Sequence, residues 1–144
     1  MDHIIEQPDQ QLGYLLVQTS WLKQRINSNA FNELGVTYVQ FVILAGILEL
    51  GVTRPIITQQ TIVVQRRLDK TMVSSVVKTL IKKQLVSKSE HPTDSRAMVL
   101  KLTSKGEEIA CKGKAKAKEI DTLFFDGIDK QALSNTLTFL LNKR

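Results

Sequence analysis

The segment from Asp69 to Thr103 constrains the fold more than any other part of this chain of 144 residues. In its first part, five apolar residues recur at i, i+3, i+4, i+7 and i+8, which is the spacing of a helix with one buried face. Those residues are Val73, Val76, Val77, Leu80 and Ile81. Asp69 is a typical N-cap, so the spacing predicts a helix over about residues 70–83. The opposite face of this helix carries short hydroxyl side chains and basic side chains.

Two strand-like runs follow this helix. Residues 85–89 and 97–102 favour short strands, and residues 91–96, which read HPTDSR, favour the turn between them. In the second run, alternation sets Met98, Leu100 and Leu102 against Ala97, Val99 and Lys101. The segment is therefore predicted to be a helix that leads directly into a β-hairpin.

Helical spacing dominates the remainder of the chain. The predicted N-caps are Thr37, Thr58, Thr103 and Asp129, and Gln40 completes a capping box with Thr37. The helices that they start are expected to close at Gly51 and near residues 65, 125 and 141. In the last helix, the side chains expected to point inward are Leu133, Leu137 and either Leu140 or Leu141.

The first predicted helix, over residues 10–29, has two apolar stripes. One stripe holds Leu12, Leu15, Leu16, Leu22 and Ile26, and the other holds Tyr14, Val17 and Trp21. A helix that is apolar on two faces is expected to be buried on two sides. We expect one side to meet the core of its own chain and the other to meet a second subunit.

Charge is concentrated in one part of the chain. Residues 66–105 hold ten Lys or Arg and three Asp or Glu, a net charge of +7, whereas the whole chain has a net charge of +6. A basic segment in an otherwise balanced chain favours a polyanionic partner, although solubility alone could also account for it.

Other totals indicate a globular, cytoplasmic protein. Apolar residues make up 42% of the chain, and no apolar run approaches the roughly 18 residues that span a bilayer. The start, MDHIIEQPDQQ, is acidic and polar, unlike a signal peptide. Cys111 is the only cysteine, so no intrachain disulfide can form.

The order of elements points to nucleic-acid binding. A short helix, a tight turn and a second helix with a polar outer face form a helix-turn-helix, and the hairpin after it makes the module winged. The second helix of such a pair fits the major groove of DNA, which is about 12 Å wide. The residues expected to meet DNA from this recognition helix are Lys70, Thr71, Ser74, Ser75, Lys78 and Thr79.

The run from Thr58 to Ile109 resembles the winged helix-turn-helix core of the multiple-antibiotic-resistance regulator (MarR) family. The strongest match is the wing, where Asp94-x-Arg96 precedes an alternating strand and the junction Leu102-Thr103-x-x-Gly106. The segments LGYLLVQTSWLKQRIN and LGVTYVQFVILAGILEL are similar to the first two helices of that family. The fold expected is mainly α with a small β-hairpin wing.

The resemblance implies a homodimer that binds a pseudo-palindromic DNA operator. It predicts one domain over residues 1–144, a DNA-binding core over 36–103 and a dimerisation region over 10–30 and 104–144. The two recognition helices would lie one helical turn apart, roughly 34 Å. Many such regulators are repressors that are released by small phenolic or lipophilic ligands.

The chain departs from the family pattern at three places. Ser75 stands where the family often has a base-reading residue such as arginine, and Gln84 replaces a common glycine before the wing. Arg66 and Arg67 replace a usual Leu-Gly pair at the turn between the two helices. Either Arg67 adopts a left-handed conformation there, or the turn has another shape.

In the wing, Arg96 is expected to enter the minor groove of DNA, with Lys88 and Ser95 as further contacts. Asp94 would repel phosphate, so it is expected to support the wing, either by orienting Arg96 or by capping the turn.

A small ligand would have aromatic residues to contact. The aromatic candidates are Tyr14, Trp21, Tyr38 and Phe41, although aromatic residues at helical spacing are more often core. Arg25 is a further candidate that would meet an anionic ligand, although such a residue is more often a surface charge. No cofactor is expected. Neither His3 nor His91 belongs to a cluster of metal ligands, and Cys111 is expected to be a passive helix residue.

Two other functions compete with DNA binding. A winged helix can serve only protein–protein contact, but such a module would not need a basic wing and recognition helix. An enzyme is not expected, because the chain has no Gly-rich phosphate loop, nucleophile–base pair or recognisable carboxylate dyad.

Overall fold

The computed structural model describes residues 8–143. Within that range it contains six helices and one two-stranded antiparallel hairpin. The elements are α1 (Pro8–Asn32), α2 (Tyr38–Leu50), α3 (Gln59–Arg66), α4 (Lys70–Lys82), β1 (Val86–Glu90), β2 (Met98–Leu102), α5 (Ser104–Phe124) and α6 (Lys130–Leu141). The predicted fold class, mainly α with a small β-hairpin wing, is confirmed.

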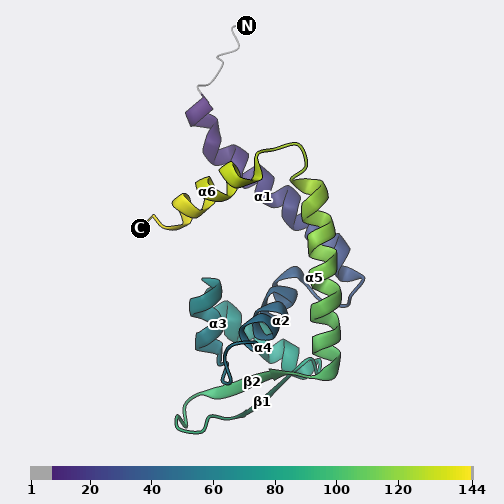
Figure 1. Cartoon of the computed structure of the whole chain (residues 1–144), viewed down its shortest axis with the longest axis vertical. Helices are drawn as coiled ribbons and strands as arrows, with labels where there is room; N and C mark the ends of the chain where they lie inside the picture. The colour runs from purple at the N-terminus through teal and green to yellow at the C-terminus, as the bar shows by residue number, and fades with distance from the viewer. Residues whose placement is uncertain (1–7, 144) are drawn as a thin grey trace, which may run out of the picture.

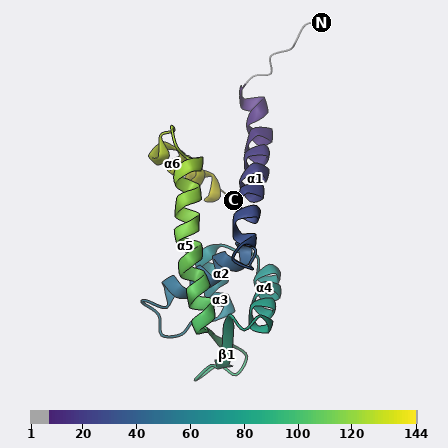
Figure 2. The ribbon, with the colours of Figure 1, turned by 90° about the vertical axis from the view of Figure 1, so that its right-hand side faces the viewer.

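The elements form two parts: a lobe at one end of the molecule and a helical region at the other end (Figure 1). Helices α2, α3 and α4 gather with the hairpin in the lobe, while most of α1, the start of α6 and the end of α5 lie away from it. Helix α5 connects the two parts, because it begins beside the hairpin and runs up along α1 (Figure 2).

The hydrophobic core lies in the lobe and takes residues from all of its elements. Phe31, at the end of α1, is fully buried and packs against Phe41 of α2 at 4.6 Å between ring centroids. The predicted buried face of α4 is also found. Val73, Val77 and Leu80 have no exposed surface, and Val76 and Ile81 are half-buried against the same core.

The predicted capping box at the start of α2 is confirmed. Thr37 Oγ1 accepts a hydrogen bond from Gln40 N, and Thr37 N donates to Gln40 Oε1, both at 3.1 Å. Lys83 Nζ, just after α4, donates to the same Gln40 Oε1 at 3.1 Å and to Gly35 O at 3.0 Å. These contacts tie the end of α4 to the connection between α1 and α2.

The junction between the wing and α5 explains the Leu-Thr-x-x-Gly motif. Thr103 Oγ1 accepts from Gly106 N at 3.0 Å and donates to Gln84 O at 2.7 Å, so it caps α5 and holds the residue before the wing. A Cβ on Gly106 would lie 2.0 Å from the carbonyl oxygen of Leu85. The motif therefore needs a threonine to cap the helix and a glycine to let two backbone segments touch.

The expected burial of the first and last helices is wrong for this chain alone. Both stripes of α1 are exposed over residues 12–22, and α6 has no buried residue. Leu137, Leu140 and Leu141, which were expected inward, are exposed, whereas Leu133 is half-buried. Only the end of α1 reaches the core, since the rest of the helix stands away from the lobe.

Strand β2 does not follow the expected alternation. Val99 and Leu100 are adjacent and both buried, whereas Met98 is exposed. The strand packs against α2, α3 and α5, and Leu100 N donates to Ile57 O at 2.8 Å in the loop before α3. Because neighbours surround this strand on more than one side, one-sided alternation fails.

Candidate nucleic-acid interface

The turn between α3 and α4 has the left-handed shape that was one of the two alternatives for it. Arg67 has φ 52° and ψ 47°, and its N–H donates to Val63 O. Asp69 then caps α4, with its Oδ2 accepting from Met72 N at 2.8 Å. Gln84, the other replaced glycine, also has a positive φ of 62°. The non-glycine residues therefore keep the backbone path that glycine favours, at some cost in free energy.

The outer face of α4 carries five of the six predicted recognition residues in exposed positions. These are Lys70, Thr71, Ser75, Lys78 and Thr79. Ser74 is half-buried, so it is less accessible than expected. The Thr79 hydroxyl donates to Ser75 O at 3.3 Å, which leaves its oxygen free to accept a further hydrogen bond.

The wing exposes Lys88, Ser95 and Arg96. The strands pair in a register that sets Lys88 opposite Leu100 and Glu90 opposite Met98. Asp94 supports the tip by capping it, because its Oδ1 accepts from the backbone N–H of Arg96 at 2.9 Å. No ion pair joins the side chains of Asp94 and Arg96, so turn capping is the alternative that the geometry supports.

His91 organises the wing tip, which the sequence interpretation missed. Its Nδ1 accepts hydrogen bonds from Thr93 N at 3.1 Å and from Asp94 N at 3.0 Å. A neutral imidazole that accepts at Nδ1 carries its proton on Nε2, an assignment that follows from these bonds. The signal in the sequence was the spacing: the polar side chain of His91 precedes the two donating N–H groups by two and three residues. This spacing is usually associated with Asp and Asn.

The basic residues of residues 66–105 fall into two groups. Arg66, Arg67 and Lys83 hydrogen-bond to groups of the protein itself. The other seven cations are exposed and make no ion pair or side-chain hydrogen bond among the described residues: Lys70, Lys78, Lys82, Lys88, Arg96, Lys101 and Lys105. Since α4, the wing and the start of α5 supply all seven, this part of the lobe presents seven cations that no described acidic side chain pairs with directly.

The five residues proposed for a ligand do not line one cavity. Tyr14, Trp21 and Arg25 are exposed on α1, and Phe41 is buried in the core. Tyr38 borders a cavity of about 520 Å³, which Lys23 and Asn27 of α1 also line. Burial, and after it the charge of Asp121, raises the pKa of Tyr38 above its ordinary value of 10.0, so its phenol is neutral.

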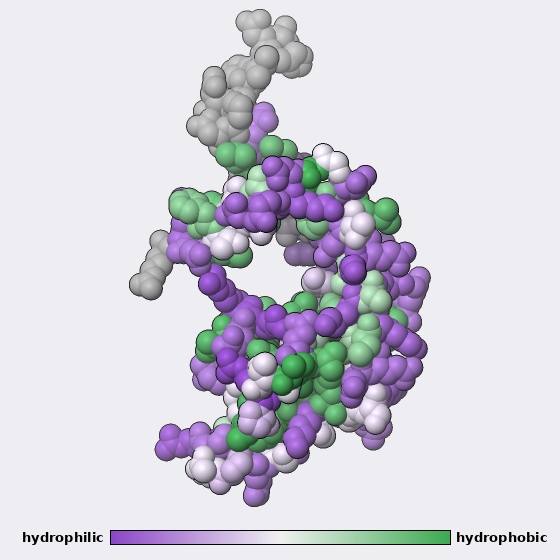
Figure 3. All heavy atoms as spheres, in the orientation of Figure 1, coloured by the Kyte–Doolittle hydropathy of each residue, from purple (hydrophilic) through white to green (hydrophobic). Residues whose placement is uncertain are grey.

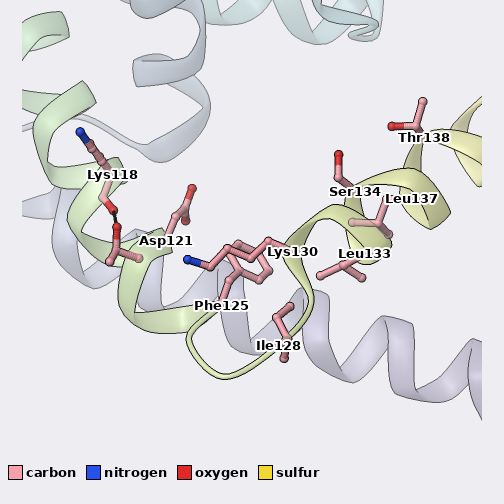
Figure 4. A pocket seen from close by; sticks show the side chains of 10 residues that line it. Lys118, Asp121, Phe125, Ile128, Lys130, Leu133, Ser134, Leu137 and Thr138 are labelled. Atoms are coloured by element: carbon pink, nitrogen blue, oxygen red, sulfur yellow. Dashed lines mark hydrogen bonds between the residues drawn. The ribbon is translucent and has the colours of Figure 1, made fainter.

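An apolar groove of about 690 Å³ lies between α1, α6 and the end of α5. Leu12, Leu15 and Leu16 line it from α1, and Leu133, Leu137 and Leu140 line it from α6. A second cavity of about 520 Å³ opens beside the α5–α6 connection, where Phe125, Ile128 and Leu133 surround it (Figure 4). Apolar side chains thus line both hollows at the end far from the wing. Figure 3 shows apolar side chains at this end and also over the lobe.

The remaining sequence candidates are the histidines, as metal ligands, and Cys111. No group of three or more His, Cys, Asp or Glu residues that could hold a metal ion is found among residues 8–143, and His3 lies outside that range. Cys111 is exposed on α5. Over the same residues, no helix has the length and apolar content that crossing a membrane requires.

A short helix, a left-handed turn, a second helix with a polar face and a β-hairpin together define a winged helix-turn-helix protein. The family described as ArnR1-like, winged-helix domain matches residues 32–120. An uncharacterized HTH-type transcriptional regulator of Bacillus subtilis (strain 168), YdcH, is 33% identical over 118 residues, which are 82% of this chain and 80% of YdcH.

Solved structures agree with this fold. BpsR of Bordetella bronchiseptica has a TM-score of 0.83 at 22% identity, and the match covers 100% of this chain and 99% of BpsR. A mutant MarR of E. coli in complex with operator DNA has a TM-score of 0.75 at 22% identity, over 90% of each chain. This chain belongs to the ArnR1-like winged-helix family and is an HTH-type transcriptional regulator. Its fold is that of the MarR structures, as the resemblance to the MarR family implied.

Proposed function

We propose that this chain is a homodimeric repressor that binds a pseudo-palindromic operator through α4 and the wing. The observation that carries the proposal is the set of seven exposed cations on α4, the wing and the start of α5 that make no ion pair within residues 8–143. Lysine and arginine side chains without acidic partners are free to neutralise phosphates and release the counterions of DNA. A protein-interaction module would not need this charge.

In this proposal, α4 lies in the major groove. Lys70 and Lys78 reach phosphates or guanine acceptors, and the hydroxyl groups of Thr71, Ser75 and Thr79 meet base edges or phosphates. The half-buried Ser74 has the least access. In the wing, Arg96 probes a narrow minor groove beside Lys88 and Ser95, while Asp94 holds the turn.

The dimerisation region proposed for residues 10–30 and 104–144 agrees with the exposed apolar residues of α1 and α6. Trp21 is 59% exposed and Phe139 is 67% exposed, which is unusual for large apolar side chains in a monomer. A second copy of the chain that covers these helices would bury both stripes of α1. It would also place the two α4 helices on one side of the duplex, about one helical turn apart.

Release by a small phenolic or lipophilic ligand is the regulatory part of the proposal. The cavity beside Tyr38 lies where α1 meets α2, between the dimerisation region and the lobe. The published structure of BpsR concerns the regulation of its DNA binding by 6-hydroxynicotinic acid, a small aromatic ligand. A ligand bound here would contact both parts of the chain and could change their relative position.

Selection of genomic DNA tests the function directly. The purified protein is mixed with fragments of the genome that encodes it, and the retained fragments are sequenced at moderate salt. We expect a small set of fragments that share an inverted repeat, with binding that weakens steeply as salt rises. If no fragment binds better than random DNA, the chain is not a sequence-specific repressor, and the protein-interaction alternative gains support.

Arg96→Ala tests the wing. We expect operator binding to weaken by about 1–3 kcal/mol, because the variant loses a cation and its contact in the minor groove. The measurement is a fluorescence anisotropy titration with the selected operator. Arg54→Ala, which removes the same charge from the exposed α2–α3 loop, is the matched control and should bind as the wild type does. Equal affinity of the Arg96 variant would remove this arginine from the interface.

A further inference from the structure

Glu49, near the end of α2, lies between two cations from different helices. Its Oε2 accepts a hydrogen bond from Arg66 Nη2, and its Oε1 lies 3.3 Å from Lys114 Nζ. Arg66 is the last residue of α3, and Lys114 lies in α5. One carboxylate therefore joins the end of α3 to α5 across α2. We call these three residues the Glu49 clamp.

Gly46 gives the Arg66 side chain its path. A Cβ built at Gly46 would lie 3.2 Å from Arg66 Nε and 3.6 Å from Arg66 Cγ, so the arginine runs directly over this glycine of α2. Arg66 Nε is buried there without a hydrogen-bond partner among the described residues. An unsatisfied buried donor disfavours this position, so the bond to Glu49 is what holds the side chain in it.

The clamp is closed at neutral pH. Partial burial alone would raise the pKa of Glu49, but the hydrogen bonds and charges of Arg66 and Lys114 outweigh it. The pKa therefore lies below its ordinary value of 4.5, and Glu49 stays ionised at neutral pH.

The clamp binds the chain at Arg66, one residue before the turn that sets the orientation of α4. Arg67 has the left-handed conformation of that turn, and Lys70 begins the recognition helix. On the other side of the turn, Arg67 Nη1 donates to Asn142 Oδ1 at 2.9 Å, just after α6. Both arginines at the turn thus bond to other parts of the protein. Arg66 links the turn to α5 through Glu49, and Arg67 links it to the end of α6.

We propose that the Glu49 clamp sets the direction of α4 relative to α5, and through α5 the separation of the two recognition helices in the dimer. Helix α5 can transmit this constraint because it begins beside the wing and its far end lies with α1 and α6, within the region proposed for dimerisation (Figure 1). Glu49 and Arg66 are positioning residues, and neither contacts DNA. The inference rests on the proposed function, since it requires a dimer and an operator with two half-sites.

Glu49→Gln distinguishes a role in positioning α4 from a purely electrostatic role, because the two predict opposite changes in operator affinity. Removing a negative charge from the DNA-binding lobe would by itself strengthen DNA binding. Loss of positioning should instead weaken operator binding by about threefold to tenfold, while binding to random duplex DNA stays equal or becomes slightly tighter. Lys114→Gln opens the other arm of the clamp and should also lower the ratio of operator to random binding.

The most specific measurement compares the selected operator with a version that has one base pair inserted between its half-sites. The insertion rotates one half-site by roughly 34°, so the wild type should strongly prefer the original spacing. We expect this preference to shrink in Glu49→Gln. An ion pair that only stabilised the fold would leave the preference unchanged at temperatures where both proteins are folded.

Glu108→Gln is the matched control. It removes the same charge, but it breaks only the 2.8 Å ion pair with Lys112 inside α5, and it should keep the spacing preference of the wild type. Equal preferences in the Glu49 and Glu108 variants would overturn the inference.

In the double variant Glu49→Gln/Arg66→Gln, the loss of operator affinity should not exceed that of Glu49→Gln alone. Additive losses with a lower salt dependence would show that Arg66 contacts DNA. A wild type with no preferred fragment would instead overturn the proposed function.

Discussion

Gly106→Ala is expected to destabilise the fold by about 3 kcal/mol or more, although the same change in most helices is stabilising. The new Cβ would lie 2.0 Å from the carbonyl oxygen of Leu85 and 2.9 Å from its carbonyl carbon. Both are backbone atoms, so no change of rotamer relieves the overlap. The first strand of the wing and the start of α5 would have to separate, which also strains the hydrogen bonds of Thr103. Equilibrium unfolding in urea, followed by circular dichroism, measures the loss.

Gly113→Ala is the informative comparison for this prediction. Its Cβ would lie 2.3 Å from Cδ1 of Phe41, which is a side-chain atom. Replacing Phe41 by leucine should therefore recover part of the loss caused by Gly113→Ala, whereas no truncation of a neighbouring side chain should recover Gly106→Ala. Wild-type stability of Gly106→Ala would mean that the backbones of Leu85 and Gly106 are farther apart than the structure places them.

The lobe could be predicted from the sequence because its signals are local. Thr37, Thr58 and Asp69 each cap a helix through a side chain that bonds a backbone N–H three residues later. Spacing of this kind depends on a few neighbouring residues and can be read without knowledge of the tertiary fold. The buried face of α4 could also be predicted from local spacing. It meets a single core, so the apolar residues repeat at the period of one helix face.

Contacts between distant segments were not predictable in this way. The bond from Arg66 to Glu49 spans 17 residues of chain, and that from Arg67 to Asn142 spans 75. Helix periodicity showed that α1 has two apolar faces but could not show what covers them. We expected the core of the same chain to cover one face, and the structure leaves both exposed over residues 12–22. The apolar pattern of a helix specifies burial, and the partner can be another chain.

Leu16→Lys is expected to convert the proposed dimer into a folded monomer. Leu16 is 53% exposed and lines the apolar groove between α1 and α6, far from the core of the lobe. In an isolated protomer a lysine at this position would remain in water and cost little. In a symmetric dimer the change enters the interface twice, and each buried ammonium without a partner costs several kcal/mol. Sedimentation equilibrium over a range of concentrations measures the change in association.

Operator binding should fall about 100-fold or more in the same variant, because a monomer can occupy only one half-site and loses the high effective concentration of the second lobe. Binding to random DNA should fall much less, since each lobe keeps its cations. Val52→Lys is the matched control. It introduces the same side chain on the α2–α3 loop, where Val52 is 83% exposed and lies outside the groove, so association should not change. If Leu16→Lys still dimerises with the wild-type dissociation constant, the groove is not the interface. The exposed stripes of α1 must then meet something other than a second copy of this chain.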